Sequence, residues 1–228
     1  MEAIVLAGGL GTRLRGVVDD VPKPMAPVQG RPFLALILDQ LVGAGFKTAI
    51  IATGYRHEAI RSYFGADYRG LALRYSVEDE PLGTGGAIRL ACAQADARDV
   101  FVLNGDTYLE LDFRAMMEAH VRAGSHLSMA ICHVSDVARY GALELCDDRV
   151  QRFLEKGRSG PGWINGGTYV LGPALRARLR PQGAFSFEQD LLAPEVSSIR
   201  PLAFRSSGLF IDIGIPQDYA RAQQIFAE

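Results

Sequence analysis

The stretch AIVLAGGLGTRL, residues 3–14, joins a short apolar run directly to a glycine-rich loop. The run Ala3–Leu6 has the length and residue types of a buried strand, and Gly8, Gly9 and Gly11 follow it. A loop after the first strand of an α/β sheet lies at the carboxyl edge, where ligands bind. Glycines also let backbone N–H groups approach phosphate oxygens closely. The stretch therefore predicts an α/β fold whose first loop binds an anion.

Strand-like and helical patterns alternate through the first half of the chain. Apolar, β-branched runs predict strands at Ala3–Leu6, Thr48–Thr53, Leu71–Val77 and Val100–Leu103. Amphipathic patterns predict helices at Phe33–Val42, Arg56–Phe64, Ala87–Ala95 and Phe113–Ala123. This alternation is typical of right-handed βαβ units that build a mostly parallel sheet.

The second half contains strand patterns with fewer helices between them. Strands are predicted at His126–His133, Ala142–Cys146, Val150–Leu154 and Trp163–Leu171, and helices at Ser186–Leu192 and Gln217–Ala227. This indicates an antiparallel or mixed extension of the sheet. The predicted fold class is therefore α/β, with a Rossmann-like mixed, mostly parallel sheet flanked by helices. No convincing linker interrupts the chain, so residues 1–228 are expected to form a single domain.

Composition limits the classes of partner. The 228 residues carry a net charge of −2, which favours neither a nucleic acid nor an anionic membrane surface. The three cysteines lie far apart, which argues against a disulfide framework or a structural zinc site. The N-terminus lacks a signal-peptide pattern, and no apolar run reaches the length of a membrane span. A cytoplasmic enzyme or binding domain for small molecules is expected, and assembly into a homo-oligomer is left open.

Three explanations compete for the glycine-rich loop. A dinucleotide-binding fingerprint counted from Gly9 would need a glycine where Leu14 stands, and a GxxxxGK[ST] phosphate loop is absent. A plain glycine turn without a ligand is the third explanation. Arg13 and Lys23 favour a ligand, because a guanidinium fork and an ammonium charge both bind phosphate. Lys23 also stands between two prolines, which restrict its backbone.

The segment LAGGLGTRL, followed by PKPM at residues 22–25, resembles the signature of the sugar-nucleotide pyrophosphorylases, the nucleotidyltransferases that act on sugar 1-phosphates. Further motifs follow in the family's order: EPLGTGGA (80–87), NGD (104–106), RYG (139–141), FLEK (153–156), NGG (165–167) and DIG (212–214). Among subfamilies, MEAIVLAGGLGTRLR, VPKPMAPVQGRPFL and EDEPLGTGGAI look like the bacterial D-glycero-α-D-manno-heptose 1-phosphate guanylyltransferases. The resemblance implies the nucleotide-diphospho-sugar transferase fold, with a nucleotide-binding part at about 1–110 and a sugar-phosphate-binding part, an insertion in the Rossmann-like sheet, at about 111–228.

The resemblance also implies a reaction. A sugar phosphate oxygen attacks the α-phosphorus of a nucleoside triphosphate directly, with Mg²⁺ present and pyrophosphate as the leaving group. For this chain it implies GTP and heptose 1-phosphate as substrates, and GDP-heptose for a surface polysaccharide such as capsule or lipopolysaccharide as the product. Arg13 would then bind the β- and γ-phosphates and Lys23 the α-phosphate, as the catalytic residues. The nucleotide cradle would comprise Leu6, Ala7, Gly8, Gly9, Gly11 and Thr12.

The remaining motifs imply the metal and substrate contacts. Asp106 and Asp212 each follow a strand-like run and would hold Mg²⁺, which prefers carboxylate and phosphate oxygens. The chain has Ile215 where the family commonly has a threonine or serine, which removes a hydroxyl that would cap a helix. Residues expected at the sugar phosphate are Tyr140, Gly141, Glu155, Lys156, Asn165 and Gly166, and those expected at the nucleobase are Gly83, Thr84, Gly85 and Glu80.

Several alternatives stay open. Guanine has two N–H donors on one edge that a carboxylate of Glu80 or Glu78 would accept, but the choice of guanine depends on the subfamily resemblance alone. Mannose or glucose 1-phosphate with GTP, UTP or dTTP would need the same machinery. A catalytically silent homologue that binds nucleotide sugars is a different class of function. In every case, the two cations and the two carboxylates should face one another across a single cleft.

Overall fold

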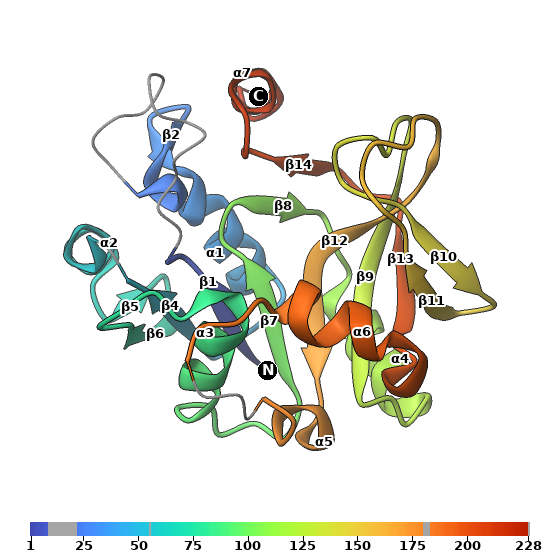
Figure 1. The fold of residues 1–228 in the computed structure, drawn as a ribbon. Helices are drawn as coiled ribbons and strands as arrows, with labels where there is room; N and C mark the ends of the chain where they lie inside the picture. Colours follow the sequence, from blue (N-terminus) through green and yellow to red (C-terminus); the bar gives the residue numbers. More distant parts are fainter. Residues whose placement is uncertain (9–21, 55, 180–182, 228) are drawn as a thin grey trace.

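The computed structural model describes residues 1–8, 22–54, 56–179 and 183–227. Its main element is a ten-stranded sheet with the order β10-β11-β13-β9-β12-β7-β1-β4-β6-β5 (Figure 1). These strands are β1 (Glu2–Leu6), β4 (Thr48–Thr53), β5 (Asp67–Tyr68), β6 (Leu71–Val77), β7 (Val100–Asn104), β9 (Leu127–Val134), β10 (Leu143–Cys146), β11 (Arg149–Phe153), β12 (Gly162–Leu171) and β13 (Leu202–Ser206). Two small sheets pair β2 (Pro27–Val28) with β3 (Arg31–Pro32) and β8 (Thr107–Leu109) with β14 (Phe210–Asp212).

Helices pack on both faces of the main sheet. They are α1 (Phe33–Gly43), α2 (His57–Phe64), α3 (Gly83–Cys92), α4 (Phe113–Arg122), α5 (Pro173–Arg176), α6 (Ala193–Ile199) and α7 (Pro216–Ile225). Two further helical segments are a 3-10 helix, η2 (Lys23–Met25), and a π-helix, η3 (Phe187–Leu192). Within the described part of the chain, no helix combines the length and apolarity needed to cross a membrane.

The sheet confirms the predicted fold class. Strands β7, β1, β4 and β6 are parallel neighbours, and Ile4 of β1 lies opposite Ile50 of β4 and Val102 of β7. The second half adds the mixed extension, because β12 is antiparallel to β7 and β9 whereas β13 is parallel to β9. β13 is absent from the predicted strands, because its segment LAFRS shows neither a continuous apolar run nor a regular alternation.

Side chains of the central strands alternate between two cores. Ala3 and Val5 of β1 face the core formed with α1, α2, α4 and α7, whereas Ile4 faces the core formed with α3, α5, α6 and η3. Successive Cβ atoms of a strand point to opposite faces, so β1, β4 and β7 each contribute side chains to both cores. Burial on both faces explains why these strands read as continuous apolar runs without polar alternation.

The glycines at the start of α3 form its first turn, which corrects the predicted start at Ala87. The helix begins at Gly83, and the N–H of Gly85 donates to the carbonyl of Phe185 at 2.9 Å. A Cβ on Gly85 would overlap the Phe185 ring, so glycine is required for the segment that leads into η3 to pack here. Glycine has a low helix propensity, so the sequence does not predict a helical turn here. Packing against Phe185 stabilises the turn in the folded chain.

The small β8–β14 sheet lies above the carboxyl ends of the central strands in the view of Figure 1. Asp212 pairs in register with Thr107, and the N–H of Ile213 donates to the carbonyl of Asp106 at 3.0 Å. Gly105 links β7 to β8, and a Cβ there would lie 2.5 Å from the carbonyl oxygen of Leu6. A glycine is therefore needed where the end of β1 meets this turn.

Candidate active site

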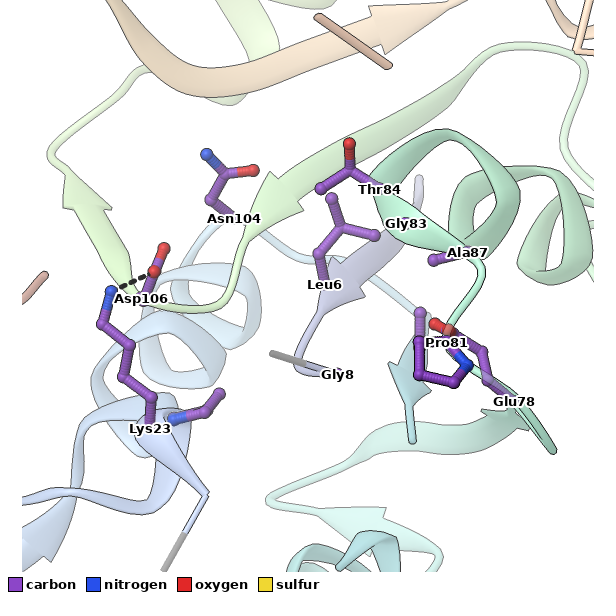
Figure 2. A pocket seen from close by; sticks show the side chains of 12 residues that line it. Leu6, Gly8, Lys23, Glu78, Pro81, Gly83, Thr84, Ala87, Asn104 and Asp106 are labelled. Atoms are coloured by element: carbon purple, nitrogen blue, oxygen red, sulfur yellow. Dashed lines mark hydrogen bonds and ion pairs between the residues drawn. The ribbon is translucent and has the colours of Figure 1, made fainter. Parts of the chain in front are cut away.

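A cavity of about 370 Å³ opens at the carboxyl edge of β1, β4 and β7. Figure 2 shows Lys23 and Asp106 on one side of it and Glu78 and Pro81 on the other. The described residues that line it are Leu6, Gly8, Lys23, Pro24, Ala52, Glu78, Pro81, Gly83, Thr84, Ala87, Asn104 and Asp106. The cavity lies where a doubly wound sheet is expected to bind its ligand.

Lys23 is held in this cavity by a short turn. Pro22 has an extended backbone, and its carbonyl accepts the N–H of Met25 at 2.7 Å, which closes the η2 turn. The Lys23 ammonium donates to Asp106 Oδ2 (Figure 2). It also lies 3.9 Å from Asp212 Oδ1. Its side chain is only 15% exposed, so the flanking prolines hold a cation that is largely withdrawn from solvent.

Asp106 and Asp212 meet at the same lysine although they are distant in sequence. Burial raises the pKa of the Asp212 carboxyl, and the charge of Asp106 raises it further, against the opposing effects of Lys23 and Arg139. The backbone N–H of Gly214 also donates to Asp212 Oδ1, at 2.7 Å. The two carboxylates therefore form a partly desolvated negative site with a single lysine between them.

This donor set fits Mg²⁺ when substrate phosphates are present. Among the described residues, no group of three or more His, Cys, Asp and Glu side chains could hold a metal alone. Mg²⁺ is usually bound by one or two carboxylates together with phosphates and water. Asp106 and Asp212 match that requirement, whereas a metal that needs a full protein cage would not be satisfied.

A second cavity of about 150 Å³ adjoins the first, and Asn104 lines both. It gathers Thr107, Arg139, Tyr140, Lys156, Asn165, Gly167, Glu188, Phe210 and Asp212. Three of the residues predicted for the sugar phosphate, Tyr140, Lys156 and Asn165, therefore lie together beside the carboxylate of Asp212. Glu155 is exposed and does not line this cavity, and Gly166 packs against Leu109 and Ala130.

Gly141, the remaining residue predicted for the sugar phosphate, has a positive φ of 84°, and a Cβ there would lie 3.5 Å from the Lys156 side chain. Gly141 therefore lies beside Lys156 but does not line the cavity. Its neighbour Tyr140 forms part of the cavity wall.

Glu188 and Arg139 line the second cavity, and the sequence reasoning assigned neither of them to the site. Glu188 in η3 accepts hydrogen bonds at Oε1 from the Asn165 amide at 2.8 Å and from the Tyr169 hydroxyl at 2.6 Å. π-helical turns occur often at functional sites, but their hydrogen-bond pattern has no local sequence signature. Arg139 belongs to the RYG motif and pairs with Asp212 and Asp218, both of which lie far along the chain.

At the nucleobase end, the geometry favours Glu78 over Glu80. Glu78 lines the cavity, and its Oε2 accepts the N–H of Leu82 at 2.8 Å, whereas Glu80 is exposed and outside the lining. Burial raises the pKa of the Glu78 carboxyl, and this hydrogen bond opposes the increase. Gly83 and Thr84 line the cavity, but Gly85 contacts Phe185 instead.

The described part of the N-terminal loop ends at Gly8. Leu6 and Gly8 line the cavity, and the N–H of Ala7 donates to the carbonyl of Ala52 at 2.7 Å. The predicted phosphate contacts Gly9, Gly11, Thr12 and Arg13 lie outside the described residues. Of the expected single cleft, the structure thus shows the half that contains Lys23, Asp106 and Asp212, and the roles of these residues stay predictions.

Comparison with known proteins identifies the family. The family model described as "Nucleotidyl transferase" matches residues 2–228. The chain is 45% identical over 224 residues to the D-glycero-alpha-D-manno-heptose 1-phosphate guanylyltransferase of Aneurinibacillus thermoaerophilus, which covers 98% of this chain and 97% of that protein. It is 39% identical over 220 residues to the protein of the same name from Campylobacter jejuni, covering 96% of this chain and 97% of the relative.

The structural comparison agrees with the sequence comparison. The crystal structure of HddC from Yersinia pseudotuberculosis matches with a TM-score of 0.89 and 40% identity, covering 99% of both chains. A second structure of HddC, complexed with GMP-PN, matches with a TM-score of 0.88. The resemblance drawn from the motifs and the predicted nucleotide-diphospho-sugar transferase fold are thereby confirmed. The chain belongs to the nucleotidyl transferase family.

Proposed function

We propose that this chain transfers GMP from GTP to D-glycero-α-D-manno-heptose 1-phosphate in a Mg²⁺-dependent reaction that gives GDP-heptose and pyrophosphate. The observation that carries the proposal is the position of Lys23 against Asp106 and Asp212, where the two cavities meet. A cation and two carboxylates at this junction suit a reaction in which two phosphate-bearing substrates must approach each other.

The chemistry is a direct displacement. The sugar phosphate oxygen attacks the α-phosphorus of GTP, and pyrophosphate leaves in line with the attack. Lys23 contributes a positive charge at the α-phosphate, where the two anionic substrates repel each other most strongly. Asp106 and Asp212 would hold Mg²⁺, which supplies further charge neutralisation at the phosphate oxygens. Arg13 is proposed to bind the β- and γ-phosphates, which become the leaving pyrophosphate.

The second cavity is proposed to bind the sugar 1-phosphate. Lys156 supplies a cation for its phosphate, while Asn165 and Glu188 present an amide and a carboxylate to the sugar hydroxyls. The heptose is supported by the names of the Aneurinibacillus and Campylobacter relatives, which align over nearly the full length of this chain. GTP is supported by the same names and by the guanine nucleotide in the HddC complex.

A substrate panel tests this proposal. Pyrophosphate release is measured with GTP, ATP, UTP and dTTP against heptose, mannose and glucose 1-phosphates, with Mg²⁺ or with EDTA. We expect the highest kcat/KM for GTP with the heptose 1-phosphate, and no turnover in EDTA. Preference for another pair would replace the proposed substrates, and turnover with no pair would favour a silent nucleotide-sugar-binding homologue.

Glu78 is expected to select guanine. Its carboxylate can accept the two donors of the guanine edge while retaining the bond from Leu82, because each carboxylate oxygen has two acceptor positions. Glu78→Gln places an amide donor there and should raise KM for GTP by roughly tenfold to a hundredfold, with little change in kcat. Glu80→Gln is the matched control from the same loop and should leave KM unchanged. An equal effect of both variants, or none, would remove Glu78 from base selection.

The ionisation of Glu78 gives the same test a pH dependence. Only the carboxylate accepts both guanine donors, so KM for GTP should rise as the pH falls through the pKa of this group. Because burial raises that pKa, the rise should begin at a higher pH than for an exposed glutamate. The pH profile of KM in Glu78→Gln should lack this step; persistence of the step would assign it to another group.

The proposed product would feed synthesis of a surface polysaccharide such as capsule or lipopolysaccharide. The enzyme is proposed to act in the cytoplasm on small-molecule substrates, without a nucleic acid or a membrane as partner. The polysaccharide is what the resemblance of the motifs implies, and small-molecule substrates are supported by the HddC structure complexed with GMP-PN.

A further inference from the structure

The guanidinium of Arg139 joins two carboxylates at the edge of the second cavity. Arg139 lies in the segment between β9 and β10. Its Nη2 donates to Asp212 Oδ2 at 3.0 Å, and its Nη1 pairs with Asp218 Oδ2 in the first turn of α7. All three side chains are less than one-third exposed, with exposed fractions of 29%, 24% and 18%. The three side chains therefore form a partly buried ion-pair cluster and not a solvated surface pair.

The contact divides the two oxygens of Asp212 between different partners. Oδ2 is taken by Arg139, whereas Oδ1 accepts the N–H of Gly214 and faces Lys23. A Cβ on Gly214 would lie 2.8 Å from Asp212 Oδ1 and 3.1 Å from Arg139 Nη2, so the group is packed too tightly for another side chain. Asp212 ends a strand of only three residues, and the Arg139 fork supplies the restraint that so short an element cannot.

Arg139 is itself held from two sides. Asp218 fixes one nitrogen of the fork, and the guanidinium carbon lies 4.9 Å from the centre of the Tyr140 ring. Tyr140 in turn packs edge-on against Phe210, at a ring-centre distance of 5.5 Å. The same arginine therefore connects the C-terminal helix, a wall of the second cavity and the carboxylate that faces Lys23.

We propose that Arg139 is a positioning residue for Asp212: it holds Oδ2 so that Oδ1 stays turned toward Lys23, and Asp218 in turn orients Arg139. The inference rests on the proposed function, because the orientation matters only if Asp212 holds the metal with GTP. A lysine cannot replace the fork, since its single ammonium group cannot hold both carboxylates in a planar arrangement. Loss of a partner that orients a metal ligand typically weakens metal binding by about 10- to 100-fold.

The test separates metal binding from nucleotide binding. GTP affinity is measured by calorimetry with Mn²⁺ and again with EDTA. The dissociation constant in EDTA divided by the dissociation constant with Mn²⁺ gives the contribution of the metal. For Arg139→Lys we expect this ratio to fall by about tenfold or more, with little change of the affinity in EDTA. Asp218→Asn leaves both Arg139 and Asp212 in place and should give a smaller fall. In crystals of Arg139→Lys, the Asp212 carboxylate should lose its single orientation.

The matched control is Arg205→Lys. Arg205 pairs with the exposed Asp148 and belongs to neither cavity lined by Lys23 or Asp212. An unchanged ratio in Arg139→Lys would overturn the assignment, and so would an equal weakening with Mn²⁺ and EDTA, which indicates general loss of structure. If Arg139→Lys fails to fold, an unchanged ratio in Asp218→Asn overturns it instead. Failure of the unmodified chain to bind GTP or release pyrophosphate would overturn the proposed function, and the role of Arg139 with it.

Discussion

Lys23→Ala is expected to lower kcat by about 10²- to 10³-fold while GTP still binds. The ammonium is held among Asp106, Asp212 and the proposed α-phosphate position, so its charge contributes most when the two anionic substrates are in contact. Pre-steady-state measurement of pyrophosphate release, together with calorimetric GTP binding, separates the chemical step from the affinity.

Lys47→Ala is the control for loss of a lysine, because Lys47 is exposed and lies outside both cavities. Lys23→Ala should not weaken Mg²⁺ binding, since it removes a cation that contacts Asp106. Turnover equal to that of the unmodified chain would remove Lys23 from the mechanism. A large loss of GTP affinity with unchanged kcat would make it a binding residue only.

Asp106→Asn is expected to raise the Mg²⁺ concentration needed for half-maximal activity by at least about tenfold, and to lower activity strongly at limiting Mg²⁺. The amide keeps the shape of the side chain but loses the charge that a hard divalent cation requires. The substitution also removes a charge that raises the pKa of Asp212, so the remaining carboxylate becomes easier to ionise. Full Mg²⁺ titrations of initial rate at fixed GTP provide the measurement.

The control for Asp106→Asn is Asp96→Asn, because Asp96 forms an exposed pair with Arg74 far from either cavity. Its Mg²⁺ titration should coincide with that of the unmodified chain. An identical titration for Asp106→Asn would contradict the ligand assignment. Weaker GTP binding in EDTA would instead indicate that Asp106 contacts the nucleotide without a metal.

Local patterns in the sequence were sufficient for the central sheet. The strands Thr48–Thr53 and Leu71–Val77 occur with the predicted boundaries. The first is buried on both faces and leaves a continuous apolar run in the sequence, whereas the second has one exposed face and leaves an alternating pattern. The start of α3 was missed because Gly83–Gly86 is a poor helix former, and only the packing of Phe185 explains a helix there. The predicted loss of a cap at Ile215 is confirmed, since α7 begins without a side-chain cap and with Pro216 in its first turn.

The candidate site was only partly accessible to the same reasoning. Lys23, Asp106 and Asp212 could be selected from their motifs, whereas Glu188 and Arg139 could not be given roles. Their partners lie distant in sequence, and no local period records a long-range pair of polar side chains. Glu78 and Glu80 are both glutamates of the same loop, so the sequence does not show which of them lines the cavity. The difference arises from how the 78–82 segment folds over the cavity.

The sequence by itself determined the alternation of strands and helices around the central strands, and it placed the glycine-rich stretch and the candidate phosphate and metal contacts in local motifs, because each of these depends on neighbours in the chain. Tertiary structure alone decided that Asp212 reaches Asp106, through the pairing of β14 with β8, and that Arg139 restrains it. Burial patterns specify which face of an element is covered, but they leave open which distant element covers it. The geometry of the candidate site follows from those distant pairings, and so it could be seen only in the folded chain.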